Sequence, residues 1–226
     1  MKILVVDVGG NKLKILVSGQ KEPHKVPSGP HLSAAQMVAA VRKAVAGERY
    51  DRVSVGYPGP VRENRPAEEP FNLGRGWVRF DYERGFGKPV RFINDAAMQA
   101  LGSYDGGRML FLGLGTGLGS ALVLDGLVQP LEMAHLLYRN GKTYEDFLGK
   151  HGLDRAGKKR WRRLVFEIVP RLRHAFQVDE VVIGGGNSKQ LKELPPATRL
   201  GDNANAFLGG VRLWQGLPGR KPAARR

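Results

Sequence analysis

The chain has 226 residues, of which 42% are hydrophobic and 25% charged, values that exclude disorder over most of its length. It has no cysteine, which excludes disulfides, thiolate zinc sites and cysteine nucleophiles. A formal net charge of +15 predicts attraction to polyanions. No apolar run is long enough to span a membrane and the N-terminus is unlike a secretion signal, so we expect a cytoplasmic protein without a membrane partner.

The first half of the chain predicts a sheet with two helices. Short apolar and β-branched runs indicate its strands, at residues 3–8, 13–17, 52–57 and 91–93. Residues 9–11 form a tight turn between the first two strands, and Ser33 caps a helix that runs to Ala46. Residues 62–88 are rich in Pro, Gly and charge, and we interpret them as a long surface loop. The second helix opens at Asn94-Asp95.

The second half predicts another sheet, followed by helices. Its strands are expected at residues 109–114, 120–124 and 181–183. An apolar stripe from Trp161 to Leu172 indicates an amphipathic helix that is interrupted or kinked at Pro170. A last helix at about 203–214 closes the fold.

This order of elements predicts an α/β fold of two lobes with a cleft between them. We expect an N-terminal lobe at 1–105, a C-terminal lobe at 106–214 and a basic, disordered tail at 215–226.

Positive charge is concentrated in two segments. Residues 150–173 hold nine Lys and Arg against two acidic residues, and residues 219–226 add four more basic residues. One interpretation is a solvated helix face and a basic terminus, and the other is a track for a polyanion. No zinc finger, helix-turn-helix or aromatic-rich RNA-binding motif is present, so we expect no specific nucleic-acid partner.

Three glycine-rich segments could approach an anion closely. In Asp7-Val8-Gly9-Gly10, a carboxylate that could hold hydrated Mg²⁺ precedes two residues without Cβ. Residues 113–120 carry four alternating glycines between two strands, where we expect positive φ or backbone contact. At 184–189 a strand enters a helix N-terminus. The structural alternatives are a hairpin without function, a bulged hairpin and a helix-entry turn, respectively.

Two polar clusters point to chemistry on a hydroxyl group. Asp95 at a helix start is either a cap or a general base that takes a proton from an alcohol. Glu132-x-x-His135, followed by Glu145, offers carboxylates and an imidazole for hydrogen bonds to a polyol. A lone histidine can equally be structural.

In this order and spacing, the motifs resemble the ROK family of sugar kinases, which has the actin-like (ribonuclease H-like) ATPase fold. They are most similar to its polyphosphate glucokinase branch, which also has a loop similar to Asn72-Leu73-x-x-x-Trp77. The resemblance runs from about residue 1 to residue 214. It implies transfer of a phosphoryl group from inorganic polyphosphate and/or ATP to the 6-hydroxyl of glucose or a related hexose, with Mg²⁺, in a protein that forms homodimers.

The resemblance also assigns roles to single residues. It makes Asp95 the general base and Asp7 the residue that orients Mg²⁺ through water. The sugar hydroxyls would be held by Asn72, Asn94, Glu132, His135 and Glu145. The donor would be bound by Gly9, Gly10, Asn11, Lys14, Gly115, Thr116, Gly117, Gly185, Gly186 and Lys189.

Three departures from the family pattern stand out. Asn11 occupies a position that usually carries a hydroxyl residue. Ala134 replaces the glycine of E-x-G-H, and its methyl group would cost roughly 1 kcal/mol and shift His135 if the turn needs positive φ. The cysteine-rich zinc motif of many relatives is absent, as it is in the polyphosphate branch. The alternatives are an ATP-dependent kinase of another hexose and a catalytically degenerate sugar-binding protein of the same fold.

Overall fold

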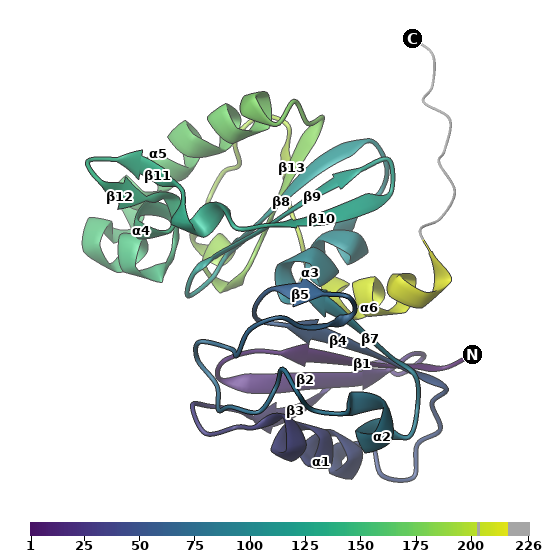
Figure 1. The fold of residues 1–226 in the computed structure, drawn as a ribbon. Helices are drawn as coiled ribbons and strands as arrows, with labels where there is room; N and C mark the ends of the chain where they lie inside the picture. Colours follow the sequence, from purple (N-terminus) through teal and green to yellow (C-terminus); the bar gives the residue numbers. More distant parts are fainter. Residues whose placement is uncertain (203, 217–226) are drawn as a thin grey trace. The chain divides into compact units, whose positions relative to one another are not determined.

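The computed structural model describes residues 1–202 and 204–216, so all but the first two residues of the expected tail lie outside the described residues (Figure 1). The described chain forms two compact units. One comprises residues 1–98 and 206–216, and the other comprises the described part of 99–205. Each unit contains a five-stranded sheet with helices, which confirms the expected α/β class.

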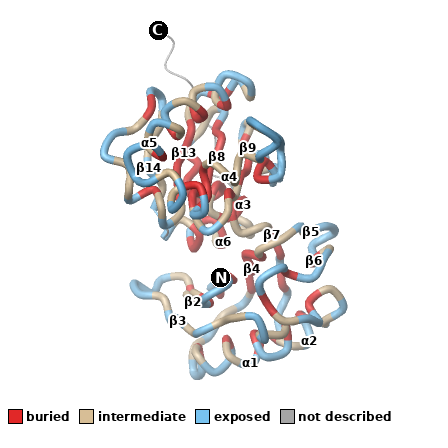
Figure 2. Tube along the Cα trace, turned by 90° about the vertical axis from the view of Figure 1, so that its left-hand side faces the viewer, coloured by how far each residue is buried: buried red, intermediate tan, exposed pale blue. Residues whose placement is uncertain are grey.

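The sheet of the first unit has the strand order β3-β2-β1-β4-β7. These strands are β1 (Ile3–Val8), β2 (Lys12–Val17), β3 (His24–Pro27), β4 (Arg52–Tyr57) and β7 (Val90–Asn94). β1, β4 and β7 are parallel, and β2 and β3 add antiparallel pairs. All six residues of β1 are buried because helices cover both faces of the sheet at its centre (burial along the chain is coloured in Figure 2).

Helices α1 (Ala34–Ala44) and α6 (Asn205–Gln215) cover opposite faces of this sheet. α1 begins with a capping box formed by Ser33 and Gln36, and its apolar face shares a core with Leu4, Val6 and Val8 of β1. Side chains alternate along a strand, so Val5 faces the other way, and there it packs against Gly210 of α6. Ser54 Oγ donates a 2.6 Å hydrogen bond to the Gly210 carbonyl. The last helix therefore belongs to the first unit, although its sequence position suggested the second lobe.

The interpretation of residues 62–88 as a surface loop was wrong for much of the segment. Besides the short hairpin β5 (Val61–Arg62) and β6 (Arg65–Pro66), it contains helix α2 (Tyr82–Phe86). Trp77 is fully buried against Tyr57, with ring centroids 5.6 Å apart, and Tyr82 and Phe86 are also buried. Tyr82 and Phe86 have the i, i+4 spacing of a helix, but one such pair in a segment rich in Pro, Gly and charge is too short a pattern to mark a helix or a core.

The second unit has the strand order β10-β9-β8-β13-β14. These strands are β8 (Arg108–Leu114), β9 (Leu118–Leu124), β10 (Leu127–Leu131), β13 (Glu180–Gly184) and β14 (Thr198–Leu200). The smaller elements are η1 (Met133–His135), β11 (Leu137–Arg139), β12 (Lys142–Thr143) and η2 (Gly186–Gln190). β8 lies at the centre, antiparallel to β9 and parallel to β13.

Helix α3 (Asp95–Ser103) follows β7 and runs from the first unit into the second, and α4 (Tyr144–Leu148) and α5 (Lys150–Ala175) belong to the second unit. The expected apolar stripe of α5 is confirmed: Trp161, Val165 and Leu172 are buried in the core beneath the second sheet. The expected kink at Pro170 was wrong, because the break lies at Gly157, which takes φ 71° without a Cβ clash. Among the described residues, no helix has the length and hydropathy needed to cross a bilayer.

Candidate active site

Three parallel strands of the first unit end at the same sheet edge, and the expected carboxylates lie near the ends of two of them. Asp7 pairs in register with Gly56 of β4, and the next residue of β4, Tyr57, pairs with Asn94 of β7. Asp7 and Asp95 therefore lie at the same sheet edge, with β4 between their two strands. Gly56 of β4 leaves room for the start of α3, because a Cβ there would lie 2.3 Å from Met98 Cε and 3.6 Å from Asp95 Cα.

Asp7 is a buried carboxylate with a lysine partner. Lys14 Nζ lies 2.8 Å from Asp7 Oδ2, and the two side chains are 30% and 8% exposed. The antiparallel register places the two residues directly opposite each other on β1 and β2. The described residues contain no group of three or more His, Cys, Asp or Glu that could hold a metal by itself. One carboxylate still fits Mg²⁺, which is usually bound by one or two carboxylates together with water and substrate phosphates.

Three hydrogen bonds fix the turn at residues 9–11. Gly9 N–H donates to the Lys12 carbonyl at 3.2 Å, Ser28 Oγ donates to the Gly9 carbonyl at 2.6 Å, and Ser28 N–H donates to the Asn11 carbonyl at 3.1 Å. Gly10 and Asn11 are exposed. Two of these bonds use the carbonyls of Gly9 and Asn11, and the third uses the Gly9 N–H. The turn is therefore fixed in a form suited to presenting the N–H groups of Gly10 and Asn11 to an anion.

Asn72 lies beside this turn, because a Cβ on Gly10 would be 3.6 Å from Asn72 Cβ. The loop that carries Asn72 is anchored by Trp77, whose backbone N–H donates to both carboxylate oxygens of Glu69 at 3.0 and 3.2 Å. The Tyr57 hydroxyl donates to the Glu68 carbonyl at 2.7 Å, and burial, together with the nearby carboxylates, raises the pKa of Tyr57. These hydrogen bonds thus fix the loop that carries the exposed side chain of Asn72.

The helix cap of α3 is Asn94, not Asp95. Asn94 Oδ1 accepts a 3.1 Å hydrogen bond from Ala97 N–H, and its Nδ2 donates to the Gly59 carbonyl at 3.3 Å. Asp95 is the first residue of the helix, half-buried, and its Oδ1 accepts from Ala96 N–H at 2.7 Å. Because the cap is provided by its neighbour, Asp95 is not needed for that structural role.

In the second unit, the glycine run at 113–119 forms the β8–β9 hairpin that its strand-turn-strand pattern predicts. Positive φ, one of the two expected reasons for its glycines, is found at none of the four. Instead, a Cβ on Gly117 would lie 2.3 Å from Glu145 Oε2. The same oxygen accepts a 2.9 Å hydrogen bond from Leu118 N–H. Glu145, expected to hold sugar, thus contacts the donor-side turn, and its sugar role stays a prediction.

Glu132 precedes the short helix η1, His135 is its last residue, and both are exposed. The buried hydroxyl of Ser120 positions this segment, because its Oγ donates to the Leu131 carbonyl at 2.9 Å and accepts from Met133 N–H at 3.3 Å. Ala134 lies within η1 and does not have positive φ. The strain that its methyl group could have caused is therefore absent.

The third glycine-rich segment packs against the second. Gly185 has φ 82°, and a Cβ there would lie 2.4 Å from the Leu114 carbonyl oxygen, so only glycine fits. Asn187, which the sequence did not single out, donates from Nδ2 to the Gly115 carbonyl at 2.7 Å. The expected helix N-terminus is a five-residue 3₁₀ helix, η2, on which Gly186 and Lys189 are exposed.

No model of a known protein family matches the sequence, and no curated protein sequence does. Solved structures do match. The inorganic polyphosphate/ATP-glucomannokinase from Arthrobacter sp. strain KM has a TM-score of 0.77 at 24% identity, covering 92% of this chain and 96% of that one. The ROK family glucokinase from Streptomyces griseus, solved with glucose and AMPPNP, has 0.78 at 19%, covering 96% and 100%. The chain has the fold of the ROK sugar kinases.

The ROK fold is not restricted to enzymes. A ROK family transcriptional regulator, described as a homologue of the E. coli MLC protein, matches with a TM-score of 0.71 at 15% identity, covering 94% of this chain and 77% of that one. A shared fold does not determine activity, which has to be inferred from the site residues.

Proposed function

We propose that this protein is a hexose kinase that transfers a phosphoryl group from inorganic polyphosphate and/or ATP to the 6-hydroxyl of glucose. The observation that carries the proposal is the placement of Asp95. It begins α3 at the carboxyl edge of the first sheet, with its capping role taken by Asn94. The glucomannokinase and the glucokinase with the same fold support a sugar acceptor.

Asp95 accepts the proton of the attacking hydroxyl group in this proposal. General bases of this kind typically contribute about 10²- to 10⁴-fold in rate. Positioning and charge neutralisation supply most of the remainder in phosphoryl transfer. Mg²⁺, held through water by Asp7, would neutralise charge on the donor phosphates when bound. Lys14 adds a fixed positive charge on the same strand pair.

The donor would be bound by the amides of the two glycine-rich segments of the second unit, together with Lys189. Asn187 joins these segments by its bond to Gly115, so they form one surface. Glu132 and His135 offer exposed polar groups to the sugar hydroxyls.

The test is a coupled assay for glucose 6-phosphate, run separately with ATP and with polyphosphate, on the wild type and on Asp95→Asn. We expect turnover with at least one donor and a loss of at least about 10²-fold in the variant, with glucose binding retained. Near-normal turnover of Asp95→Asn would remove Asp95 from the base role. Glucose binding by the wild type without turnover on either donor would identify a degenerate sugar-binding protein instead.

A further inference from the structure

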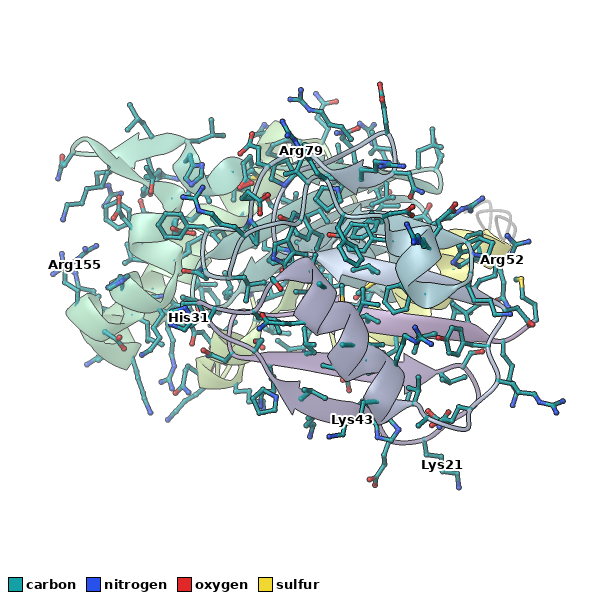
Figure 3. The ribbon with its side chains drawn as sticks, turned by 60° about the horizontal axis from the view of Figure 1, so that its bottom comes forward. Lys21, His31, Lys43, Arg52, Arg79 and Arg155 are labelled. Atoms are coloured by element: carbon teal, nitrogen blue, oxygen red, sulfur yellow. The ribbon has the colours of Figure 1, made fainter. Side chains whose placement is uncertain are left out.

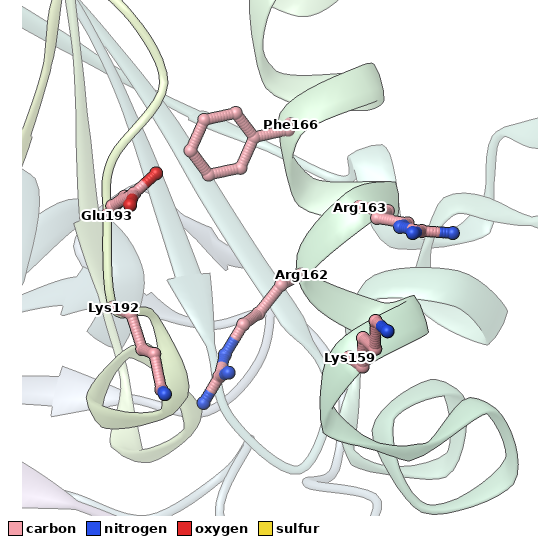
Figure 4. Close-up of a pocket in the computed structure, with 6 residues that line it drawn as sticks. All are labelled: Lys159, Arg162, Arg163, Phe166, Lys192 and Glu193. Atoms are coloured by element: carbon pink, nitrogen blue, oxygen red, sulfur yellow. The ribbon is translucent and has the colours of Figure 1, made fainter.

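A basic groove lies on the second unit. It has a volume of about 590 Å³ and lies between α5 and the segment that follows η2. Its lining residues are Lys159, Arg162, Arg163, Phe166, Lys192 and Glu193. Arg162 and Lys192 reach toward one another from the two sides (Figure 4). A second groove, of about 490 Å³, shares Lys159 and Arg163 with the first, so the two form one continuous basic surface over α5.

Most cations of this surface lack carboxylate partners. Among the described residues, no ion pair involves Lys159, Arg160, Arg163 or Lys192. Glu167, which lines the second groove, is already paired with Arg139 and, at 3.2 Å, with Arg171. Like charges repel one another when they are closer than the Debye length, which is about 8 Å at physiological ionic strength. The cations that line this groove therefore repel their neighbours. A bound polyanion would relieve that repulsion.

The groove is physically joined to the donor-side segments. The Arg162 guanidinium donates from Nε to the carbonyl of Gln190, the last residue of η2. At the other end of η2, Asn187 bonds to Gly115 of the glycine hairpin. Lys192 follows η2 by two residues, so one short segment connects the expected donor site to the groove.

We propose that this groove, defined by Lys159, Arg162, Arg163 and Lys192, binds the distal part of a long inorganic polyphosphate chain whose end lies at the donor-side glycines. The inference rests on the proposed kinase function and adds a second anion site to it. Each unit of a polyphosphate chain carries a negative charge, which matches a row of cations without further recognition groups. A single-stranded nucleic acid also needs aromatic surfaces for its bases, and Phe166 is the one aromatic residue that lines the groove.

The experiment measures binding of long-chain polyphosphate and of tripolyphosphate without sugar, so that no turnover is required. The variant is Lys159→Gln/Arg163→Gln/Lys192→Gln, which keeps Arg162 because its bond to Gln190 supports η2. We expect its affinity for long chains to fall at least tenfold, with tripolyphosphate almost unaffected. The slope of log K against log salt concentration should become less steep by about 2, because each of the three removed contacts contributes roughly 0.7 to it.

A matched control removes the same charge from the first unit. Lys21→Gln/Lys43→Gln/Lys88→Gln replaces three exposed lysines, two of which are labelled in Figure 3. This control should bind long-chain polyphosphate within about twofold of the wild type, because none of the three lysines lines the groove. An equal loss in both triple variants, or no loss in the groove variant, would overturn the proposal.

Two further outcomes separate this inference from the proposed function. If the wild type phosphorylates no sugar but the groove variant loses long-chain binding, the polyphosphate site in the groove would be supported and the proposed kinase function refuted. Efficient polyphosphate-dependent phosphorylation that the groove variant retains for all chain lengths would support the kinase and refute the groove. Oligothymidylate that competes with polyphosphate at equal affinity would mark a nucleic-acid surface and refute the polyphosphate assignment.

Discussion

Glu145 Oε2 accepts a 2.9 Å hydrogen bond from the backbone N–H of Leu118, across 27 positions of the sequence. Glu145 lies on α4, whose start is fixed by a capping box between Thr143 and Asp146. The carboxylate proposed to hold a sugar hydroxyl therefore also holds the turn proposed to hold the donor. Any movement of this side chain toward a sugar would act directly on that turn.

Replacing Glu145 should consequently affect both substrates. Glu145→Ala leaves the N–H of the buried Leu118 without its acceptor, which costs about 1–3 kcal/mol of unfolding free energy. We expect it to raise KM for glucose and for the donor together, while Glu145→Gln, which keeps an acceptor oxygen, retains most of the stability. Denaturant unfolding and steady-state kinetics measure the two effects. An increase in KM for glucose alone would show that the turn does not depend on Glu145.

The two residues at the start of α3 should differ in what they support. Asn94→Ala removes the helix cap and should lower the unfolding free energy by about 1 kcal/mol. Asp95→Asn keeps a side chain of the same size and an acceptor for Ala96 N–H, so it should lower the unfolding free energy less than Asn94→Ala does. Urea unfolding of both variants measures the two losses of unfolding free energy. A larger loss for Asp95→Asn would mean that Asp95, not Asn94, stabilises the helix start.

Gly185 should tolerate no side chain. Gly185→Ala incurs the left-handed backbone cost of about 1–2 kcal/mol and also a clash with the Leu114 carbonyl. Gly19→Ala is the matched control, because Gly19 has φ 98° with nothing within 4 Å of a Cβ. We expect Gly185→Ala to be less stable than the control by at least about 1 kcal/mol in thermal or urea unfolding. Equal losses would show that the segment shifts freely away from β8.

Stability at acid pH should depend on Asp146. Its pKa is lowered from 3.8, chiefly by the hydrogen bond from Thr143 N–H, at 2.8 Å. A carboxyl whose pKa is lower in the folded state stabilises the fold fully above its unfolded pKa and progressively less as the pH falls toward its folded pKa. The wild type should thus lose stability below about pH 4 more steeply than Asp146→Asn. Identical pH profiles of urea unfolding for the two proteins would exclude this contribution.

The sequence by itself determined the strands and turns that carry the motifs. β1, β4, β8 and β13 are buried apolar runs, and the chemistry of their glycine-rich turns is local, so pattern was enough. The strands β3 and β14 were missed because they are short edge strands, without the apolar alternation on which such predictions depend.

Only the tertiary structure decided which residues meet. The sequence could not show that Asn94 takes the cap and leaves Asp95 without that task, nor that Gly117 is small because Glu145 packs against it. It could not place Gly210 beside Ser54, 156 positions away, or bury Trp77 in a polar segment. Helical and strand periods record which face of an element is apolar, whereas the partner of that face is set by packing between distant parts of the chain.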